Sequence, residues 1–332
     1  MRLPRVLLLV LVGLLLAGCG GDRDDGTTTS SAGAAAGAFP VTVTHARGST
    51  TIEQEPRRVV AVGLRDQDTL LALGIKAVGA MDWFGQGTFA KWPWEDWGGA
   101  PPKVVSTGGF DIDFERVAAA RPDLILGVYQ DLKKGDYDKL TKIAPTVAQS
   151  AKHKPYTMPW REETREIARA VGRTQQAEAL IAKVDARFAQ VRKEHPEFRG
   201  KTAAMVDPSG TNTFVFGSTD PRGQFLEELG FAPSAPIERA VKGEFGTEIS
   251  DERLDLLDVD HLFVLADRNT RGKLLSKPLF RRLDVAKEGR VVELPYYDAP
   301  QYGAAVAFNT VLSIPYGIDG VLKQMAASTR TR

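Results

Sequence analysis

The sequence has few of the residues from which proteins build metal and redox sites. One cysteine occurs among 332 residues, which excludes a disulfide framework and a cysteine-based structural zinc site. The four histidines lie too far apart in the chain for the two-histidine motif of a zinc-binding helix. We therefore expect no protein-bound metal and no resident cofactor. The histidines are His45, His153, His195 and His261.

An excess of charge of one sign is also absent. The chain has 43 lysines and arginines against 42 aspartates and glutamates, a net charge of +1, so nothing points to nucleic acid as a partner. The Gly-x-Ser-x-Gly elbow, the Gly-x-x-x-x-Gly-Lys phosphate loop and the His-Glu-x-x-His motif are missing from the sequence. We expect a protein that is not an enzyme, with a two-lobed α/β enzyme as the remote alternative.

The most continuous hydrophobic run lies at the N-terminus and is short. Arg2 and Arg5 precede Val6–Leu16, which is about half the ~20 residues that a spanning helix needs. Leu16-Ala17-Gly18-Cys19 follows and resembles the cleavage site of bacterial lipoproteins. We predict that Cys19 is lipidated and anchors the mature chain on the extracytoplasmic face of the cell membrane.

From Pro40 onward, short runs typical of buried strands alternate with helical segments. This alternation predicts a mostly parallel sheet covered by helices in each half of the chain, that is, a Rossmann-like α/β lobe in each half. The expected strands are Val59–Val62, Lys76–Ala80, Asp123–Val128, Thr146–Ala148, Thr202–Val206, Phe214–Phe216, Leu262–Leu265 and Val291–Leu294. The expected helices are Asp66–Leu73, Gly223–Leu229, Asp251–Leu257 and Ala304–Met325.

A long helical stretch, Glu162–His195, separates the two sets of strands. Gly172 is expected to break this stretch, and Pro196 ends it. Apolar residues in its second part recur at spacings of three and four, which is typical of a helix that packs on a core. We predict two α/β lobes joined by a long interlobe helix. The expected segments are 1–18 (lipoprotein signal peptide), 19–39 (flexible tether), 40–160 (N-terminal lobe), 161–196 (helical connection) and 197–332 (C-terminal lobe).

A similar pattern occurs in both halves. Glu115-Arg116-Val117 leads to Asp123 and a buried strand, and Glu252-Arg253-Leu254 leads at the same spacing to Asp260 and a buried strand. Equal placement before a strand favours a duplicated lobe over a chance match.

Several motifs occur in a specific order along the chain. They are the lipoprotein site, the tether, Pro56-Arg57-Arg58-Val59-Val60, Asp68-Thr69-Leu70-Leu71-Ala72-Leu73-Gly74 and Arg121-Pro122-Asp123-Leu124-Ile125-Leu126. Together they resemble the iron-siderophore/cobalamin (class III) substrate-binding lipoproteins of bacterial ABC importers. The segment Asp82-Trp83-Phe84-Gly85 through Trp92-Pro93-Trp94 looks like their actinobacterial ferric-siderophore branch.

The resemblance implies a fold and a set of partners. The expected fold is two α/β lobes joined by a long helix, with the ligand between them. The expected partners are a ferric siderophore and an ABC permease dimer with its ATPase, served by a monomeric binding protein. In that family one acidic residue on each lobe docks onto arginines of the permease, and Glu115 and Glu252 occupy the matching positions here. Alternatively, both are solvated glutamates at helix starts, where the helix dipole favours negative charge.

A ferric siderophore already fills the coordination sphere of its iron, so the protein needs aromatic faces and hydrogen-bond donors instead of metal ligands. Residues that follow strands are expected to supply them, because open α/β sheets bind ligands at the carboxyl ends of their strands. Arg222 is the leading candidate, since the family often carries a ligand-binding arginine at this strand-to-helix turn. The predicted ligand-binding residues are Arg65, Trp83, Tyr129, Trp160, Phe216, Arg222, Arg268 and Tyr297.

Other roles are open for several of these residues. Each arginine alone could be a surface ion-pair partner, and Trp83 and Trp160 could be core residues. The tryptophans at 92, 94 and 97 are expected to pack their Pro/Gly-rich loop onto the lobe. Haem is the alternative ligand, with Tyr129, His153 or Tyr297 as a possible axial ligand. Cobalamin is a further alternative within the same fold.

Overall fold

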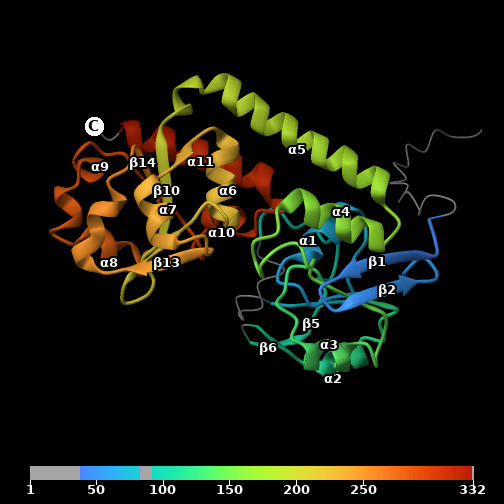
Figure 1. Cartoon of the computed structure of the whole chain (residues 1–332). Coiled ribbons are helices and arrows are strands. Elements are labelled where there is room, and N and C mark those ends of the chain that lie inside the picture. The colour runs from blue at the N-terminus through green and yellow to red at the C-terminus, as the bar shows by residue number, and fades with distance from the viewer. Residues whose placement is uncertain (1–37, 83–91, 109, 331–332) are drawn as a thin grey trace, which may run out of the picture. The chain divides into compact units, whose positions relative to one another are not determined.

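The computed structural model describes residues 38–82, 92–108 and 110–330, and all of them belong to one compact unit of the chain. For reference, the N-terminal half comprises the elements from β1 to β9, and the C-terminal half those from β10 to α11 (Figure 1). A two-stranded antiparallel hairpin precedes the first sheet. Its strands are β1 (Val41–His45) and β2 (Gly48–Ile52).

The N-terminal half contains a five-stranded sheet in which every pair of neighbours is parallel. Its central strands are buried on both faces, which explains why their sequences are continuous apolar runs. In spatial order the strands are β5 (Lys103–Val104), β4 (Gly79–Ala80), β3 (Val59–Ala61), β8 (Leu124–Gly127) and β9 (Thr146–Ala148). The other elements are α1 (Asp66–Ala72), β6 (Ser106–Gly108), β7 (Asp111–Ile112), α2 (Phe114–Ala119) and α3 (Lys134–Leu140).

The sheet of the C-terminal half is mixed. Strands β10, β14 and β15 are parallel, whereas β11 runs antiparallel to both β10 and β13. In spatial order the strands are β13 (Gly246–Ile249), β11 (Thr213–Phe216), β10 (Thr202–Asp207), β14 (His261–Leu265) and β15 (Val291–Leu294), and β12 (Ala232–Pro233) pairs with β10. The helices are α6 (Pro221–Leu229), α7 (Ala235–Val241), α8 (Arg271–Leu275), α9 (Asp284–Lys287), α10 (Tyr302–Phe308) and α11 (Ser313–Arg330), with 3-10 turns η1 (Pro196–Phe198), η2 (Asp251–Leu257) and η3 (Phe280–Arg282).

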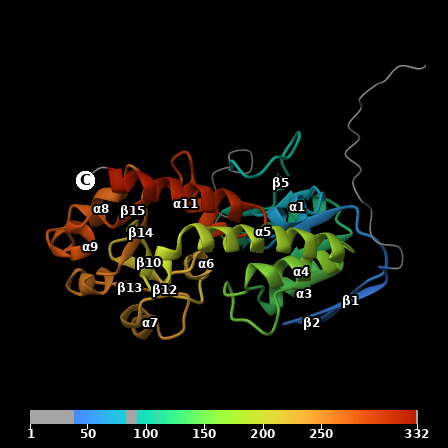
Figure 2. The same ribbon diagram turned by 90° about the horizontal axis from the view of Figure 1, so that it is seen from above.

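Helices α4 (Trp160–Ala170) and α5 (Thr174–Glu194) connect the two halves, and the predicted break lies at Gly172, whose φ is 68° (Figures 1 and 2). The predicted apolar stripe of α5 is the buried face of this helix. Ala177 belongs to the core of the N-terminal half, and Val184 and Phe188 belong to the core of the C-terminal half. One helix therefore contributes to both hydrophobic cores.

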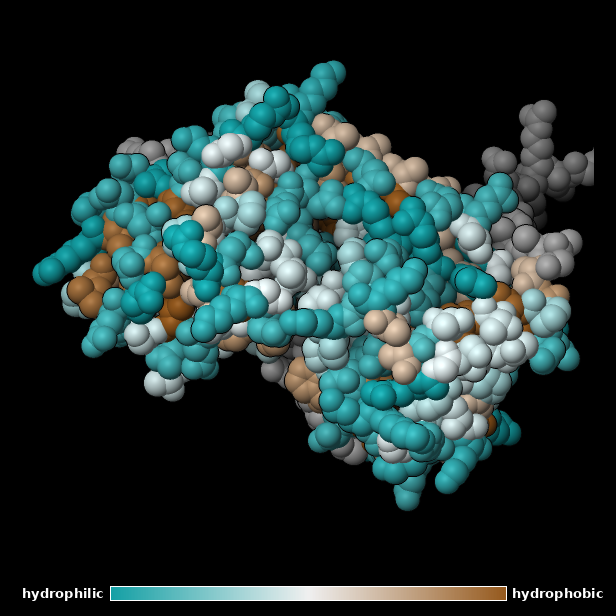
Figure 3. All heavy atoms as spheres, viewed as in Figure 1, coloured by the Kyte–Doolittle hydropathy of each residue, from teal (hydrophilic) through white to brown (hydrophobic). Residues whose placement is uncertain are grey.

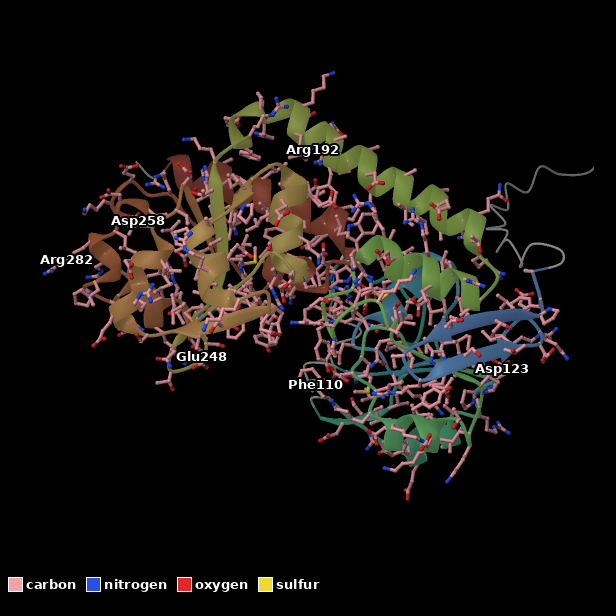
Figure 4. All side chains as sticks on the ribbon, viewed as in Figure 1. Phe110, Asp123, Arg192, Glu248, Asp258 and Arg282 are labelled. Atoms are coloured by element: carbon pink, nitrogen blue, oxygen red, sulfur yellow. The ribbon has the colours of Figure 1, made fainter. Side chains whose placement is uncertain are left out.

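The similar patterns of the two halves occupy equivalent positions in the two sheets. Strand β8 lies next to β3, and β14 lies next to β10. Asp123, labelled in Figure 4, accepts hydrogen bonds from the backbone N–H groups of Arg57 and Arg58 at 2.9 Å each, just before β3. Asp260 accepts one from the N–H of Thr202 at 2.8 Å, at the start of β10. In each half, an aspartate carboxylate thus accepts backbone hydrogen bonds at the beginning of the equivalent strand.

Three predicted elements differ from the observed ones. The expected helix Asp251–Leu257 is the 3-10 element η2, whose backbone is not helical at Arg253. The expected strand Lys76–Ala80 is reduced to its last two residues. The expected single helix Ala304–Met325 is two helices, α10 and α11, separated at Asn309, which is left-handed with φ 47°. Pro315 lies in the first turn of α11, where its missing N–H has no intrahelical partner in any case. A proline there favours a new helix start over an uninterrupted helix.

On the face shown in Figure 3, hydrophilic residues cover most of the surface and hydrophobic residues are visible in separate patches. Among the described residues, none of the helices combines the length and the hydrophobicity that crossing a bilayer requires.

Candidate functional site

A chain of ring contacts leads from Arg65 to the surface of the N-terminal half. Arg65 precedes α1, and its guanidinium lies over the ring of Tyr129, 3.5 Å from the ring centroid. Tyr129 contacts Tyr156 edge-on at 5.8 Å between centroids, and Tyr156 contacts Phe110 at 6.0 Å. The Tyr129 hydroxyl donates a hydrogen bond to the carbonyl of Tyr156 at 2.7 Å. We call Arg65, Tyr129, Tyr156 and Phe110 the N-terminal ladder.

A second chain of the same kind leads from Arg222 to the surface of the C-terminal half. The guanidinium of Arg222 lies over the ring of Phe216, 3.9 Å from its centroid. Phe216 contacts Phe214 at 5.1 Å, and Phe214 stacks on Phe245 at 5.6 Å. We call Arg222, Phe216, Phe214 and Phe245 the C-terminal ladder.

Both ladders run from a buried arginine to an exposed phenylalanine. Arg65 is fully buried and Arg222 is 9% exposed, whereas Phe110 is 56% exposed and Phe245 41%. Exposed phenylalanines at the ends of two such chains present apolar rings to solvent, and a planar apolar or partly charged ligand can stack on them.

Each arginine is held by a carboxylate, Arg65 by Glu163 of the connecting helix α4 and Arg222 by Asp220 of its own half. Nε and Nη2 of Arg65 donate to Oε2 of Glu163 at 2.9 and 2.6 Å. Nε and Nη2 of Arg222 donate to the two carboxylate oxygens of Asp220 at 2.8 and 3.0 Å. Burial raises the pKa of Glu163 to about 7, although Arg65 acts in the opposite direction. Burial disfavours the charge of Arg222, but Asp220 more than offsets this and raises its pKa.

The two ladders come within electrostatic reach of each other. Burial raises the pKa of Tyr129, and the charges of Arg65, Asp220 and Arg222 all act on this residue. Arg222 also acts on Tyr296, whose pKa is raised by burial. Tyr129 comes from the N-terminal half and Arg222 from the C-terminal half, so the charge of the C-terminal ladder acts on the N-terminal ladder at Tyr129.

The loop after β15 lies within electrostatic reach of Arg222. The ring of Tyr297, 45% exposed, contacts Tyr296 edge-on at 4.9 Å. The carboxylate of Asp267 accepts hydrogen bonds from the N–H groups of Tyr296 and Tyr297 at 2.9 Å and of Asp298 at 2.8 Å, which fixes the loop. Arg268 is mostly exposed, with Nε 3.5 Å from Asp298.

The tryptophan loop packs against the C-terminal part of the chain. Trp92 and Trp94 stack at 5.1 Å, and Phe308 contacts both rings edge-on at 5.4 and 5.3 Å. The indole Nε1 of Trp94 donates to Asp68 at 2.9 Å. The loop therefore joins α1 to the end of α10.

Two of the predicted ligand-binding residues are buried. Trp160 is 2% exposed and belongs to the core of the C-terminal half, because it begins α4 and packs beneath α5. Arg65 is enclosed by Glu163, by the ring of Tyr129 and by the carbonyl of Phe308, to which it donates a hydrogen bond. Neither side chain is exposed in this structure, and their predicted role at the ligand stays a prediction.

The other predicted residues have varied surroundings. Tyr129, Phe216 and Arg222 form the inner parts of the ladders, and Arg268 and Tyr297 lie at the surface. Trp83 and Cys19 lie outside the described residues. Sequence reasoning missed the outer ladder residues, which no motif marks. They are Tyr156, Phe110, Phe214 and Phe245.

The two predicted docking residues are exposed and occupy similar local positions. Glu115 lies in the first turn of α2, and Glu252 lies in the first turn of η2. Each element precedes the strand next to the first strand of its sheet. Within the described residues, no group of three or more histidine, cysteine, aspartate or glutamate side chains is arranged to hold a metal ion.

Comparison with known proteins places the chain among transport proteins. Residues 59–297 match the model of the family described as "Periplasmic binding protein". "Probable siderophore-binding lipoprotein YfiY" of Bacillus subtilis is 30% identical over 272 residues, which cover 76% of this chain and 79% of that protein.

Solved structures agree in fold over almost the same length. PiaA of Streptococcus pneumoniae, in complex with ferrichrome, has a TM-score of 0.75 at 26% identity and covers 87% of this chain and 99% of its own. A periplasmic solute binding protein of Mycobacterium smegmatis has a TM-score of 0.73 at 31% identity, over 87% of this chain and 98% of its own. The mycobacterial relative fits the actinobacterial branch that the sequence resembles. The predicted α/β fold class is thereby confirmed, and the chain belongs to the periplasmic binding protein family, as a substrate-binding transport protein and not an enzyme.

Proposed function

We propose that this chain is a membrane-anchored extracytoplasmic binding protein that captures a ferric siderophore between its two halves and delivers it to an ABC permease. The carrying observation is the pair of ladders, one from each half: the charge of Arg222 acts on Tyr129, and the ion pair of Lys154 with Glu244 lies beside their outer ends. A ligand placed against both would touch the two halves at once, as a protein that closes on its ligand requires.

The chemistry of the ladders suits an iron chelate. A siderophore supplies all the ligands of its iron, so the protein has to recognise the outside of the chelate. Phe110 and Phe245 offer apolar faces, and the arginines behind them polarise the rings that they cover. Tyr297 adds a third exposed ring next to Tyr296, on which the charge of Arg222 acts.

The remaining parts of the proposal concern place and partners. Cys19 would carry the lipid anchor, residues 19–39 would form the tether, and the relative named above is itself called a lipoprotein. Glu115 and Glu252 would dock onto a two-fold symmetric permease dimer, which is coupled to its ATPase. The protein would act as a monomer.

Titration of the soluble chain, residues 40–332, with ferric hydroxamate, catecholate and citrate complexes tests the proposal. We expect saturable binding of at least one complex, and weaker binding of the same siderophore without iron. Phe110→Ala and Phe245→Ala should each weaken binding about tenfold, because each removes an aromatic contact worth about 1 kcal/mol beyond its buried area. Leu279→Ala, at an exposed apolar residue in the described region, is the control and should bind like the unaltered chain.

Haemin is the competing ligand in the same titration. Saturable binding of haemin with a Soret shift, and no binding of any ferric siderophore, would overturn the proposal. Binding of a ferric siderophore that is insensitive to both phenylalanine substitutions would place the site away from the ladders.

A further inference from the structure

The charges on the ladders are balanced inside the protein. Arg222 directs Nε and Nη2 at the two oxygens of Asp220, 2.8 and 3.0 Å away. Arg65 forms an ion pair with Glu163 at 2.6 Å, with both side chains buried. An anionic ligand group that approached Arg222 would therefore meet a carboxylate within hydrogen-bond distance of the same guanidinium.

At the outer ends of the ladders, too, a cation is paired with a carboxylate. Lys154, two residues before Tyr156, pairs with Glu244 at 2.8 Å, and Glu244 directly precedes Phe245. Surface pairs of this kind add little stability. They do, however, cancel the charge that each partner would show to a ligand.

Two further carboxylates form no salt bridge with any residue that the structure describes. Asp207 ends β10 and Asp267 follows β14, and both act electrostatically on Tyr297. Asp267 is instead satisfied by backbone N–H groups. These described residues therefore give the surroundings of Tyr297 an excess of negative charge.

We propose that the ladder site selects neutral or cationic ferric chelates and discriminates against anionic ones. The inference rests on the proposed function and adds the ligand class. Three hydroxamates each contribute one negative charge and cancel the charge of iron(III), whereas three catecholates each contribute two and leave a trianion. A like charge next to unbalanced carboxylates weakens binding at an interface that excludes water. A neutral chelate that stacks on apolar rings meets no such electrostatic repulsion.

A series of ligands with one coordination sphere tests the charge alone. Ferrioxamine B carries a free ammonium group and is cationic, its N-acetyl derivative is neutral, and its N-succinyl derivative is anionic. We expect the first two to bind the soluble chain with similar affinity, and the anionic one to bind about tenfold or more weakly. Ferric enterobactin, a trianionic tris-catecholate, should bind more weakly still.

Asp220→Asn removes the carboxylate that balances Arg222 and should reduce the discrimination against the anionic derivative about tenfold. Asp319→Asn removes the partner of Arg187 from a more exposed Arg–Asp pair between α5 and α11 and should leave the order unchanged. Because Asp220→Asn could disturb folding, the ionic-strength dependence in the unaltered chain is a second measurement. Affinity for the neutral derivative should be constant from about 50 to 500 mM NaCl, since salt screens only charges.

The two proposals fail in different ways. If no ferric complex of any charge binds, the proposed function is wrong and this inference falls with it. If ferric complexes bind but the anionic derivative or the tris-catecholate is preferred, or affinity for the anionic derivative falls as salt is added, only the charge selectivity is overturned.

Discussion

Asp68 and Glu95 lie in the interior of the protein, and their carboxyl groups act on each other. Oδ1 of Asp68 and Oε1 of Glu95 are both buried and have no hydrogen-bond partner among the described residues. Two carboxylates can only accept, so a hydrogen bond between them requires one shared proton. Glu95 also accepts from the indole N–H of Trp97 at 3.1 Å, and Asp68 accepts from Trp94 and from the Thr310 hydroxyl at 2.9 and 2.7 Å. The pair holds the tryptophan loop and the turn after α10 against α1.

Glu95→Gln should flatten the dependence of stability on pH. Burial raises the pKa of Glu95 from 4.5 to about 11, so the folded chain keeps a proton that the unfolded chain loses. Stability should therefore fall as pH rises, by up to about 1.4 kcal/mol per pH unit for one proton. Glutamine keeps a donor for Asp68 without titrating. Urea unfolding between about pH 8 and 9 should show the smaller slope in the variant.

Other carboxyl groups with raised pKa values do not account for the slope between pH 8 and 9. Glu163 titrates at about 7 and Asp66 at about 6, so both have lost their protons by pH 8. An equal slope in Glu95→Gln and in the unaltered chain would show that the proton is not held at this pair.

Thr310→Val should destabilise the protein by about 1–3 kcal/mol, because Asp68 loses a donor in a buried site that water cannot enter. Thr310→Ser keeps the hydroxyl and is the matched control, with a smaller loss from the missing methyl group. Urea denaturation of both variants at pH 7 makes the comparison. Similar losses in the two variants would mean that the methyl contact matters and the hydrogen bond does not.

Arg65→Ala should destabilise the protein by about 3–5 kcal/mol, because it leaves Glu163 buried without its cation. Adding Glu163→Gln should recover part of this loss, since a neutral amide costs less to bury than a carboxylate. Thermal or urea unfolding measures both variants. If Arg65→Ala weakened ligand binding but left stability unchanged, Arg65 would be a ligand contact and not a structural partner of Glu163.

Glu115→Ala combined with Glu252→Ala should abolish uptake of the ferric siderophore by cells and leave the affinity of the purified chain intact. Both residues are exposed and lie outside the ladders. Uptake of radioactive iron measures the first effect, and titration measures the second. Asp138→Ala, on the exposed face of α3, is a control for loss of a surface carboxylate. A lower affinity in the double variant would place these glutamates at the ligand instead.

Arg222→Lys should weaken ligand binding about as strongly as Arg222→Ala. A lysine cannot form the two-pronged contact with Asp220 and lacks the planar group that covers Phe216. Calorimetric titration with the preferred ferric complex compares the two variants. Retention of full affinity by the lysine variant would show that only the positive charge at this position matters.

Local patterns predicted most of the fold. The apolar stripe of α5, the break at Gly172 and the buried runs of β3 and β8 all depend on residues close together in the sequence. The direction of β11, in contrast, does not depend on residues close together in the sequence. Its apolar run would suit a parallel strand equally well, and only its pairing with β10 and β13 makes it antiparallel.

The site was harder to predict because its contacts join distant parts of the chain. Arg65 follows β3 as expected, but its partner Glu163 lies almost a hundred residues away and forms a buried ion pair with it. Phe110, Tyr156 and Tyr129 are likewise brought together only by the fold. Residues that come together from distant parts of the chain form no sequence motif, so sequence patterns cannot predict such contacts.

Helix α5 contributes Ala177 to one hydrophobic core and Phe188 to the other. Unfolding of either core would expose apolar residues of that helix to water. The stability of each half therefore depends on the other half being folded. Heating should accordingly give one calorimetric transition, in which the van 't Hoff and calorimetric enthalpies agree. The protein would then behave as a single cooperative unit despite its two sheets.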